Sequence, residues 1–120
     1  MSGTLFQISV GKKVVQDGLI ATYLLVGFGK PAENRDIVVE VTKRVETLAL
    51  KGGQLVLIDG PMSAHVAMVV AHGLADKFES VACFDKRTSE YVVCISRNHW
   101  FVGHSIPRAA VSDWIPAKTV

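Results

Sequence analysis

The chain has 120 residues, enough for one domain with its own core, and 49% of them are hydrophobic and 20% charged. The net charge of +2 is too small to indicate a nucleic-acid-binding protein by itself. No run of about 18 apolar residues predicts a membrane-spanning helix, and no basic segment followed by a long apolar one predicts a secretion signal. We expect the two cysteines, Cys83 and Cys94, to be free and buried, with a disulfide as the alternative. These features predict a single cytoplasmic domain over residues 1–120 with no membrane partner.

Two strands and a helix are predicted for the first half of the chain. Residues 5–10 alternate between apolar and polar side chains, and residues 19–28 are rich in β-branched and aromatic ones. The turn signal at residues 16–18 indicates that the two strands form a hairpin. Apolar residues at spacings of three and four, from Ile37 to Leu48, then predict an amphipathic helix.

The second half predicts strand, helix, strand, turn and strand. Residues 54–58 form a short apolar run, typical of a strand buried on both faces. Residues 63–78 predict a helix that is apolar nearly all round, which we expect to pack on the sheet and on a second subunit. Strands are expected at 80–84 and 90–95, joined by a turn at 86–89. The order predicts an α/β fold with a small mixed sheet and two main helices.

The junction after the third strand is a candidate anion site. Gly60 permits a close backbone approach, and Pro61 suits the first turn of a helix because its missing N–H is not needed there. Ser63 and His65 then stand at a helix N-terminus, where free N–H groups attract anions. The sequence lacks a glycine-rich dinucleotide fingerprint and a Walker lysine, so neither common mononucleotide loop is predicted.

Charged residues follow two of the predicted strands. If those strands are parallel neighbours, Asp59 and Asp85 lie at one edge of the sheet. Lys86 and Arg87 come directly after Asp85, and an arginine can bind a phosphate through two hydrogen bonds. One interpretation is an ordinary charged turn. The other is a phosphate-binding or phosphodiester-cleaving site, in which Asp85 orients a nucleophile or holds a divalent metal.

Histidines supply further candidates for chemistry. His65 and His72 are seven residues apart on one helix, so about 10 Å separates them along its axis and they cannot share one metal ion. Each either acts in a site or only packs and hydrogen-bonds locally. After the last clear strand, Arg97 and Asn98 are possible ligand contacts and His99 a possible proton-transfer group, with a solvated loop as the alternative.

The segment 53–96 resembles the small free-standing CRISPR-associated ring nucleases of type III systems. The residues that carry the resemblance are the Gly60–Pro61 helix start, the Val70–Ala71–His72 triplet, and the run 81–87 followed by the valine-rich run 91–93. The family has a Leu-Ala-His inside its helix and a Val-Tyr-Asp-Pro-Arg-Leu-Gly turn before its valine-rich strand. Lys86 replaces the usual proline.

The resemblance implies a Rossmann-like fold related to the CRISPR-associated Rossmann fold. It implies a homodimer, two of which sandwich a cyclic RNA in a ligand-bridged tetramer, and cleavage of cyclic tetra-adenylate helped by manganese. Asp85 and Arg87 match the key aspartate and arginine of the family, and His72 matches its helix histidine. A further family histidine corresponds to a position near Ala75, and a later one to Arg97, so only a shift of two residues lets His99 replace it.

Three functions therefore stand as hypotheses. The first is a ring nuclease that binds and cleaves cyclic oligoadenylate, with Asp85, Arg87, His72 and His99 as catalytic residues and Asp85 as the metal ligand, if there is one. Its ligand-binding residues are Gly60, Pro61, Ser63, His65, Lys86, Arg97 and Asn98. The second is a sensor or sequestering module that binds the same ligand without cleavage. The third is an oligomeric scaffold whose apolar helix docks a partner.

Overall fold

A computed structural model describes residues 4–15, 18–112 and 115–116 of the chain. Its elements, in chain order, are β1 (Phe6–Val14), β2 (Ile20–Phe28), α1 (Asn34–Thr47), β3 (Gly53–Asp59), α2 (Ala64–Ala75), β4 (Phe78–Asp85), β5 (Glu90–Ser96), β6 (Ser105–Pro107), the 3₁₀ turn η1 (Arg108–Ala110) and β7 (Ile115–Pro116). In the described part of the chain the strands form one seven-stranded sheet of order β6-β5-β4-β3-β2-β1-β7. β3 is parallel to β2 and to β4, and the other pairs are antiparallel. The predicted α/β fold with a mixed sheet and two main helices is confirmed.

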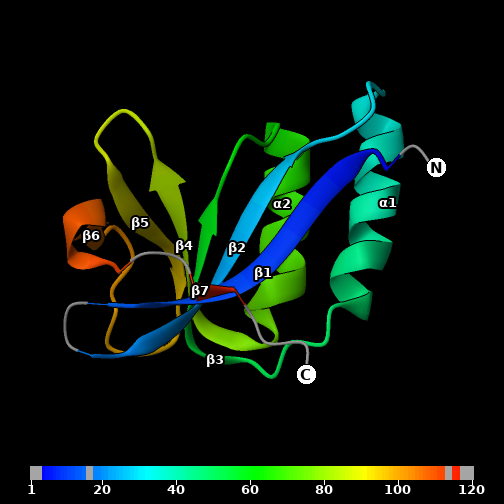
Figure 1. The fold of residues 1–120 in the computed structure, drawn as a ribbon. Helices are drawn as coiled ribbons and strands as arrows, with labels where there is room; N and C mark the ends of the chain where they lie inside the picture. Colours follow the sequence, from blue (N-terminus) through cyan, green and yellow to red (C-terminus); the bar gives the residue numbers. More distant parts are fainter. Residues whose placement is uncertain (1–3, 16–17, 113–114, 117–120) are drawn as a thin grey trace.

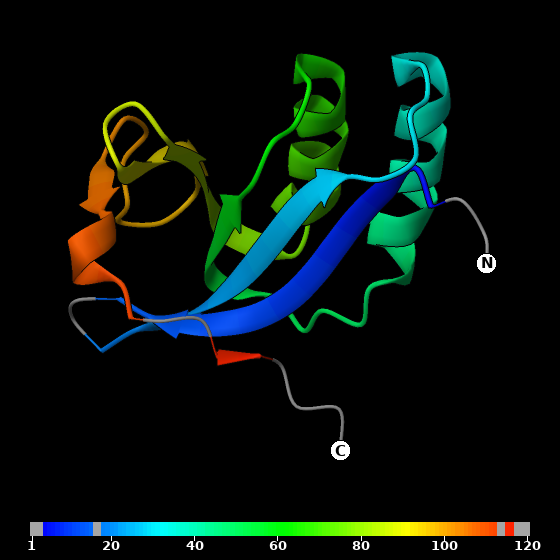
Figure 2. The same cartoon turned by 45° about the horizontal axis from the view of Figure 1, so that its top comes forward.

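Both helices cover the same face of the sheet (Figures 1 and 2). The crossovers β2–α1–β3 and β3–α2–β4 step across the sheet in the same direction. Because parallel crossovers are right-handed, two steps in one direction place both helices on one side. On the opposite face lie Trp100, from the segment between β5 and the edge strand β6, and Ile106 of β6.

The main core lies between the sheet and the helices. Each helix buries a stripe of residues spaced by four, Ile37, Val41 and Val45 from α1 and Val66, Val70 and Leu74 from α2. This spacing places the members of a stripe above one another on one helix face. The exposed side of α2 includes Met68, which is 74% exposed, so only one side of this apolar helix packs on its own domain.

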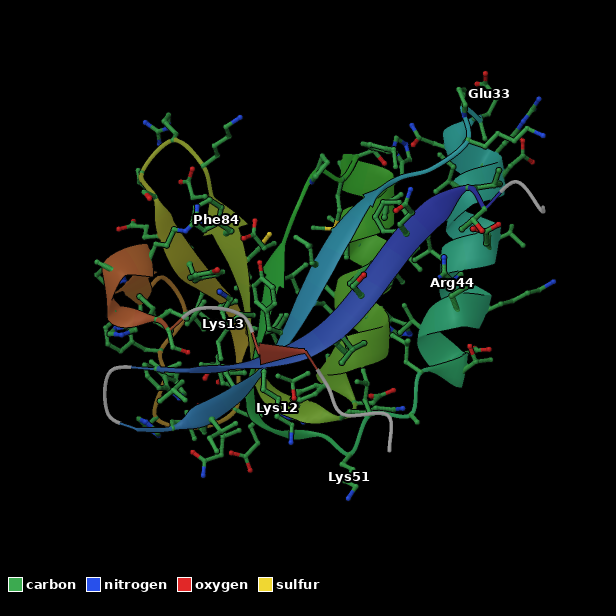
Figure 3. All side chains as sticks on the ribbon, viewed as in Figure 1. Lys12, Lys13, Glu33, Arg44, Lys51 and Phe84 are labelled. Atoms are coloured by element: carbon green, nitrogen blue, oxygen red, sulfur yellow. The ribbon has the colours of Figure 1, made fainter. Side chains whose placement is uncertain are left out.

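Charged side chains of α1 secure the start of β1. Glu40 Oε2 accepts the backbone N–H groups of Leu5 and Phe6 at 2.9 and 3.1 Å. Arg44, labelled in Figure 3, donates to the carbonyl oxygen of Phe6. These bonds give partners to backbone groups near one end of β1 and hold it against the helix.

A second core cluster lies on the face that the helices leave open. Its largest buried members are Tyr23, Leu55, Leu57, Tyr91, Trp100 and Ile106. They come from β2, β3, β5, β6 and the segment between β5 and β6. This cluster makes residues beyond 96 part of the folded domain.

Three local expectations need correction or completion. The hairpin of β1 and β2 is confirmed, but β1 continues to Val14 because its pairing with β2 extends from Phe6 to Val14. Helix α2 ends at Ala75 rather than at residue 78, since Phe78 already pairs with Gly53 as the buried first residue of β4. Of the predicted turn at 16–18, residues 16 and 17 lie outside the described part.

The cysteine prediction is right about the thiols and wrong about their burial. Both cysteines are free, but Cys83 is half-buried and Cys94 is exposed. The register of β4 and β5 shifts between Val81 and Ala82, which leaves Cys94 without a directly paired residue.

Candidate functional site

One edge of the sheet gathers most of the candidate residues. We call it the carboxyl edge and define it as the ends of β3 and β4, residues 60–63 before α2, and the turn 86–89. Ile58 pairs with Cys83, so Asp59 and Asp85 end their strands close to one another along the sheet. The prediction that both carboxylates lie at one edge is therefore confirmed. The starts of both helices and the β4–β5 turn all lie toward the top of Figure 1, with the start of α2 between the turn and the start of α1.

The β4–β5 turn is held by Asp85. Its Oδ1 accepts the backbone N–H of Arg87 at 3.0 Å, and its carbonyl oxygen accepts the N–H of Ser89 at 2.8 Å. Ser89 has a φ of 57°, the left-handed conformation that closes the turn. The side chains of Lys86 and Arg87 are exposed and make no hydrogen bond or ion pair with any described residue. A carboxylate thus orders a turn that presents two unpaired cations.

The start of α2 is constrained by Gly60. Its φ is +121°, and a Cβ atom there would lie 1.9 Å from the carbonyl oxygen of Val26 in β2. Only glycine fits this approach. Ser63 is the N-cap of α2, and its Oγ accepts the N–H of Val66 at 3.2 Å. The N–H groups of Ala64 and His65, in the first turn, remain for a bound anion.

A hollow of about 490 Å³ connects the starts of the two helices. It is lined by residues 28–34, by Ile37 and by Ser63. Lys30 supplies a cation and Glu33 a carboxylate to its rim, and both are exposed. The predicted anion site therefore extends toward α1, but with charges of both signs.

Asp59 and Asp85 face opposite sides of the sheet. Asp59 lies two residues after Leu57 and so shares its face, where Tyr23 Oη donates to Asp59 Oδ2 at 2.8 Å. Asp85 follows Val81 by four residues and shares the helix-covered face. The two carboxylates share an edge but do not face one ligand.

Two buried tyrosines hold Asp59. Tyr91 Oη also donates to Asp59 Oδ2, at 3.5 Å. Burial and the negative charge of Asp59 raise the pKa of Tyr91 to about 12, and burial and the hydrogen bond to Asp59 raise that of Tyr23 further. Sequence reasoning missed both tyrosines. Their signal was a hydroxyl on the buried side of a strand, which needs a partner.

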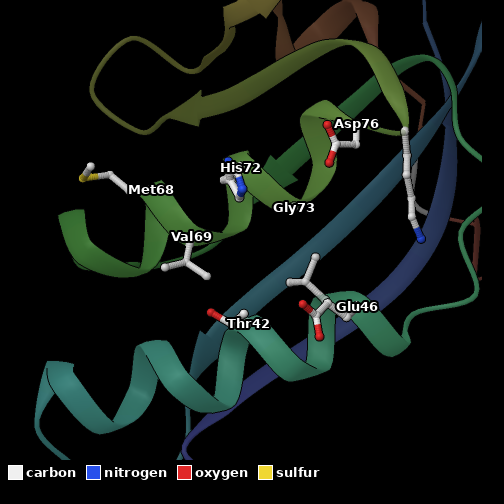
Figure 4. Close-up of a pocket in the computed structure, with 9 residues that line it drawn as sticks. Thr42, Glu46, Met68, Val69, His72, Gly73 and Asp76 are labelled. Atoms are coloured by element: carbon white, nitrogen blue, oxygen red, sulfur yellow. The ribbon is translucent and has the colours of Figure 1, made fainter.

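His65 and His72 are both exposed and lie at opposite ends of α2. His65 belongs to the first turn, at the carboxyl edge. His72 belongs to the last turn, about 10 Å further along the helix, where it lines a cleft of about 580 Å³ between α1 and α2 (Figure 4). Met68, Val69 and Glu46 line the same cleft. The fold does not bring His72 to the Asp85–Arg87 turn within one chain.

The segment after β5 lies at the other end of β4. Ser96 pairs with Ser80 while Glu90 pairs with Asp85, so about 16 Å of strand separates the two ends. Asn98 Oδ1 accepts the hydroxyl of Ser80 at 2.6 Å, and Arg97 donates to the carbonyl oxygen of Phe78 at 3.1 Å. Arg97 and Asn98 therefore bind the protein itself, and His99 is not close to Asp85.

The described residues form no preassembled metal site. Among residues 4–15, 18–112 and 115–116, no group of three or more His, Cys, Asp and Glu side chains is placed to hold a metal ion. Asp85 uses one carboxylate oxygen for the Arg87 backbone, and Asp59 lies on the other face. We therefore derive no step that passes through a metal.

No protein-family model and no curated protein matches this chain. Within the described part, no helix is long and apolar enough to cross a membrane. Function is therefore inferred from the carboxyl edge and from the motifs that it carries.

Proposed function

We propose that the protein binds a cyclic oligoadenylate, with cyclic tetra-adenylate as the expected member, and cleaves it as a ring nuclease that ends type III CRISPR antiviral signalling in the cytoplasm. The observation that carries the proposal is the Asp85–Arg87 turn beside the Gly60–Ser63 helix start. It combines two unpaired cations with free backbone N–H groups, and its residues are those of the motif resemblance.

Cleavage at this edge requires orientation and charge stabilisation rather than a strong base. The 2′-hydroxyl of the substrate attacks the adjacent phosphorus, the bond from phosphorus to the 5′-oxygen breaks, and a 2′,3′-cyclic phosphate forms. The hydroxyl proton passes to solvent, and the leaving 5′-oxygen takes one up. Arg87 stabilises the negative charge on the phosphate oxygens, while Asp85 holds the turn that presents it.

A homodimer belongs to the same proposal. Helix α2 leaves Met68 74% exposed, and Ala64 and His72 are also exposed on it. A second copy placed against this side of α2 would cover the apolar surface. In such a dimer the histidines of α2 would lie at the interface, and a ligand-bridged tetramer would pair two such dimers.

The dispersed histidines favour a second candidate, a sensor that binds the ring without cleavage. His72 lies in the interhelical cleft and His99 at the far end of β4, so neither supports proton transfer at the Asp85–Arg87 turn of its own chain. In this function the edge binds the phosphates of the ring and no bond breaks.

Incubation with cyclic tetra-adenylate, with and without manganese, tests the proposal. We expect linear products by chromatography, and at least a tenfold loss of cleavage for Arg87→Ala, because a charged hydrogen bond to phosphate is worth about 1.5–3 kcal/mol. The matched control is Lys51→Ala. Lys51 is also an exposed cation but lies at the opposite end of the sheet from Phe84 in Figure 3, so its loss changes the net charge equally and should leave cleavage unchanged.

Three results separate the hypotheses. Binding without linear product at high protein concentration selects the sensor. Equal losses for Arg87→Ala and Lys51→Ala indicate general charge attraction and overturn the assigned site. Absence of any nucleotide binding leaves the oligomeric scaffold, whose partner would dock on α2.

A further inference from the structure

The segment between β5 and β6 carries rings that the proposed function does not use. We call residues 99–104 the aromatic loop. The ring of Trp100 lies 5.0 Å from that of His99 and 5.2 Å from that of His104, and the ring of Phe101 lies 5.1 Å from that of His104. Four rings in six residues thus form one connected cluster.

Backbone hydrogen bonds fix this loop on the sheet. The N–H of Gly103 donates to the carbonyl oxygen of Val93, and the N–H of Val93 donates to that of His104, both at 2.9 Å. The N–H of Trp100 donates to Asn98 Oδ1 at 3.0 Å. The rings are therefore presented by a held backbone rather than by a free tail.

Trp100 is buried with an unused hydrogen-bond donor. Its side chain is 8% exposed, and its Nε1 is a buried nitrogen without a partner among the described residues. Buried indole N–H groups normally find an acceptor, because an unpaired one loses its hydration without compensation. The exposed rings nearby are also unusual, since Phe101 is 66% exposed.

The same rings line a cavity of about 360 Å³. His99, Trp100, Phe101 and His104 form one part of its wall, and Ser105 to Pro107 of β6 form another. This volume lies within the range of small-molecule sites, roughly 300–1,000 Å³. The cavity therefore combines aromatic surface with Trp100, whose indole nitrogen is buried and has no partner among the described residues.

We propose that this cavity binds a planar nitrogen heterocycle, specifically a purine base. A ring nitrogen of the base accepts the Trp100 N–H, and its face stacks on the exposed rings of the loop. His99 and His104 add a donor and an acceptor each when neutral, which match the mixed polar edge of a purine. A carboxylate would accept the indole N–H but would not stack on the rings. An aliphatic group would neither accept the N–H nor stack.

This inference does not depend on the proposed ring nuclease. The aromatic loop begins after the end of β5 that lies away from the Asp85–Arg87 turn and pairs with Val93 at the middle of that strand, while the β6 wall of the cavity continues toward the turn. A base bound there needs no phosphate. The probe is accordingly adenosine, which carries a purine but no phosphate.

Nuclear magnetic resonance on the full chain tests the inference. The chain has two tryptophans, so Trp114→Phe leaves Trp100 as the only indole. We expect adenosine to shift the Trp100 indole N–H signal in a saturable way. An indole signal that adenosine does not move up to millimolar concentration overturns the proposal, as does acetate that moves it equally.

Equilibrium dialysis of adenosine with variants completes the test. Trp100→Phe and Phe101→Ala should each weaken binding about tenfold, because base stacking and a matched donor contribute on that scale. Phe101 is exposed, so its variant should fold even if Trp100→Phe does not. Val102→Ala is the matched control, since Val102 is 64% exposed in the same loop and does not line the cavity. Unchanged affinity in Phe101→Ala contradicts the site.

Arg87→Ala separates this inference from the proposed function. Adenosine should bind this variant as it binds the parent protein. Loss of adenosine binding in Arg87→Ala would place the base at the carboxyl edge and overturn the aromatic-loop site. Failure of cyclic tetra-adenylate cleavage, with adenosine binding retained, would overturn the proposed function alone.

Discussion

The carboxyl edge lies where β4 ends and β5 begins, whereas the aromatic loop follows the other end of β5 and returns to its middle at Val93, and the two are built differently. At the carboxyl edge the backbone is constrained, by Gly60 against Val26 and by Asp85 on the Arg87 N–H, while two cations remain free. At the aromatic loop the side chains touch one another, while a buried donor remains unused. A fixed backbone with free cations suits phosphate, whereas stacked rings with a free donor suit a base.

Glycine substitutions should separate the two regions most strongly. Gly60 and Gly103 both have positive φ, but a Cβ at Gly60 would meet a backbone oxygen whereas none lies within 4 Å at Gly103. We expect Gly60→Ala to lower the free energy of unfolding by about 3 kcal/mol or more, and Gly103→Ala by about 1 kcal/mol. Urea denaturation measures both. Equal losses would mean that the carboxyl edge is no more constrained than the loop.

Removal of a cation should affect only ligand binding at the carboxyl edge. Arg87→Ala is expected to weaken binding of cyclic tetra-adenylate by about 1.5–3 kcal/mol, or roughly tenfold to a hundredfold. Its free energy of unfolding should stay within about 0.5 kcal/mol, because the side chain is exposed and only its backbone N–H serves the turn. Isothermal titration and urea denaturation give the two numbers. A large loss of stability would show that Arg87 is structural.

High pH should act through the tyrosines beside Asp59. Burial and Asp59 raise the pKa of Tyr91 to about 12, so the folded state keeps its proton after the unfolded chain begins to lose it near pH 10. The contribution of Tyr91 to the free energy of unfolding is fully present below pH 10. It declines between about pH 10 and 12, by about 1 kcal/mol per pH unit.

Tyr91→Phe isolates this contribution. Denaturation midpoints at pH 9, 10 and 11 should fall less steeply for the variant than for the parent protein. Identical slopes would contradict the assigned role of Tyr91. Arg87→Ala is the control, because its change lies on the turn and leaves both tyrosines in place.

The smallest effect is expected for an exposed ring of the aromatic loop. Phe101→Ala should change the free energy of unfolding by less than about 0.5 kcal/mol, because the side chain is 66% exposed. Adenosine binding should nevertheless fall about tenfold. A loss of stability of several kcal/mol would make Phe101 a packing residue and remove the contrast between the two regions.

The sequence by itself determined the elements from β1 to β5 and part of the carboxyl edge. Apolar periodicity predicted both helices, and short apolar runs predicted β3 and β4. The Gly60–Pro61 and Asp85–Arg87 patterns are local, so their positions follow from the strand that each one ends. Parallel pairing of neighbouring strands then places both at one edge.

Only the tertiary structure decided which candidates meet. His72 and His99 matched a motif or a proton-transfer role in the sequence, yet the fold places them about one helix length and one strand length from Asp85. Tyr23 and Tyr91 meet on Asp59 although they are far apart in the chain. Their side chains, from β2 and β5, project to the same face of the sheet as that of Asp59 on β3. The cavity at the aromatic loop likewise depends on β6 pairing with β5. Local patterns fix backbone conformation, whereas distances between elements depend on strand order and register, which a single sequence does not state.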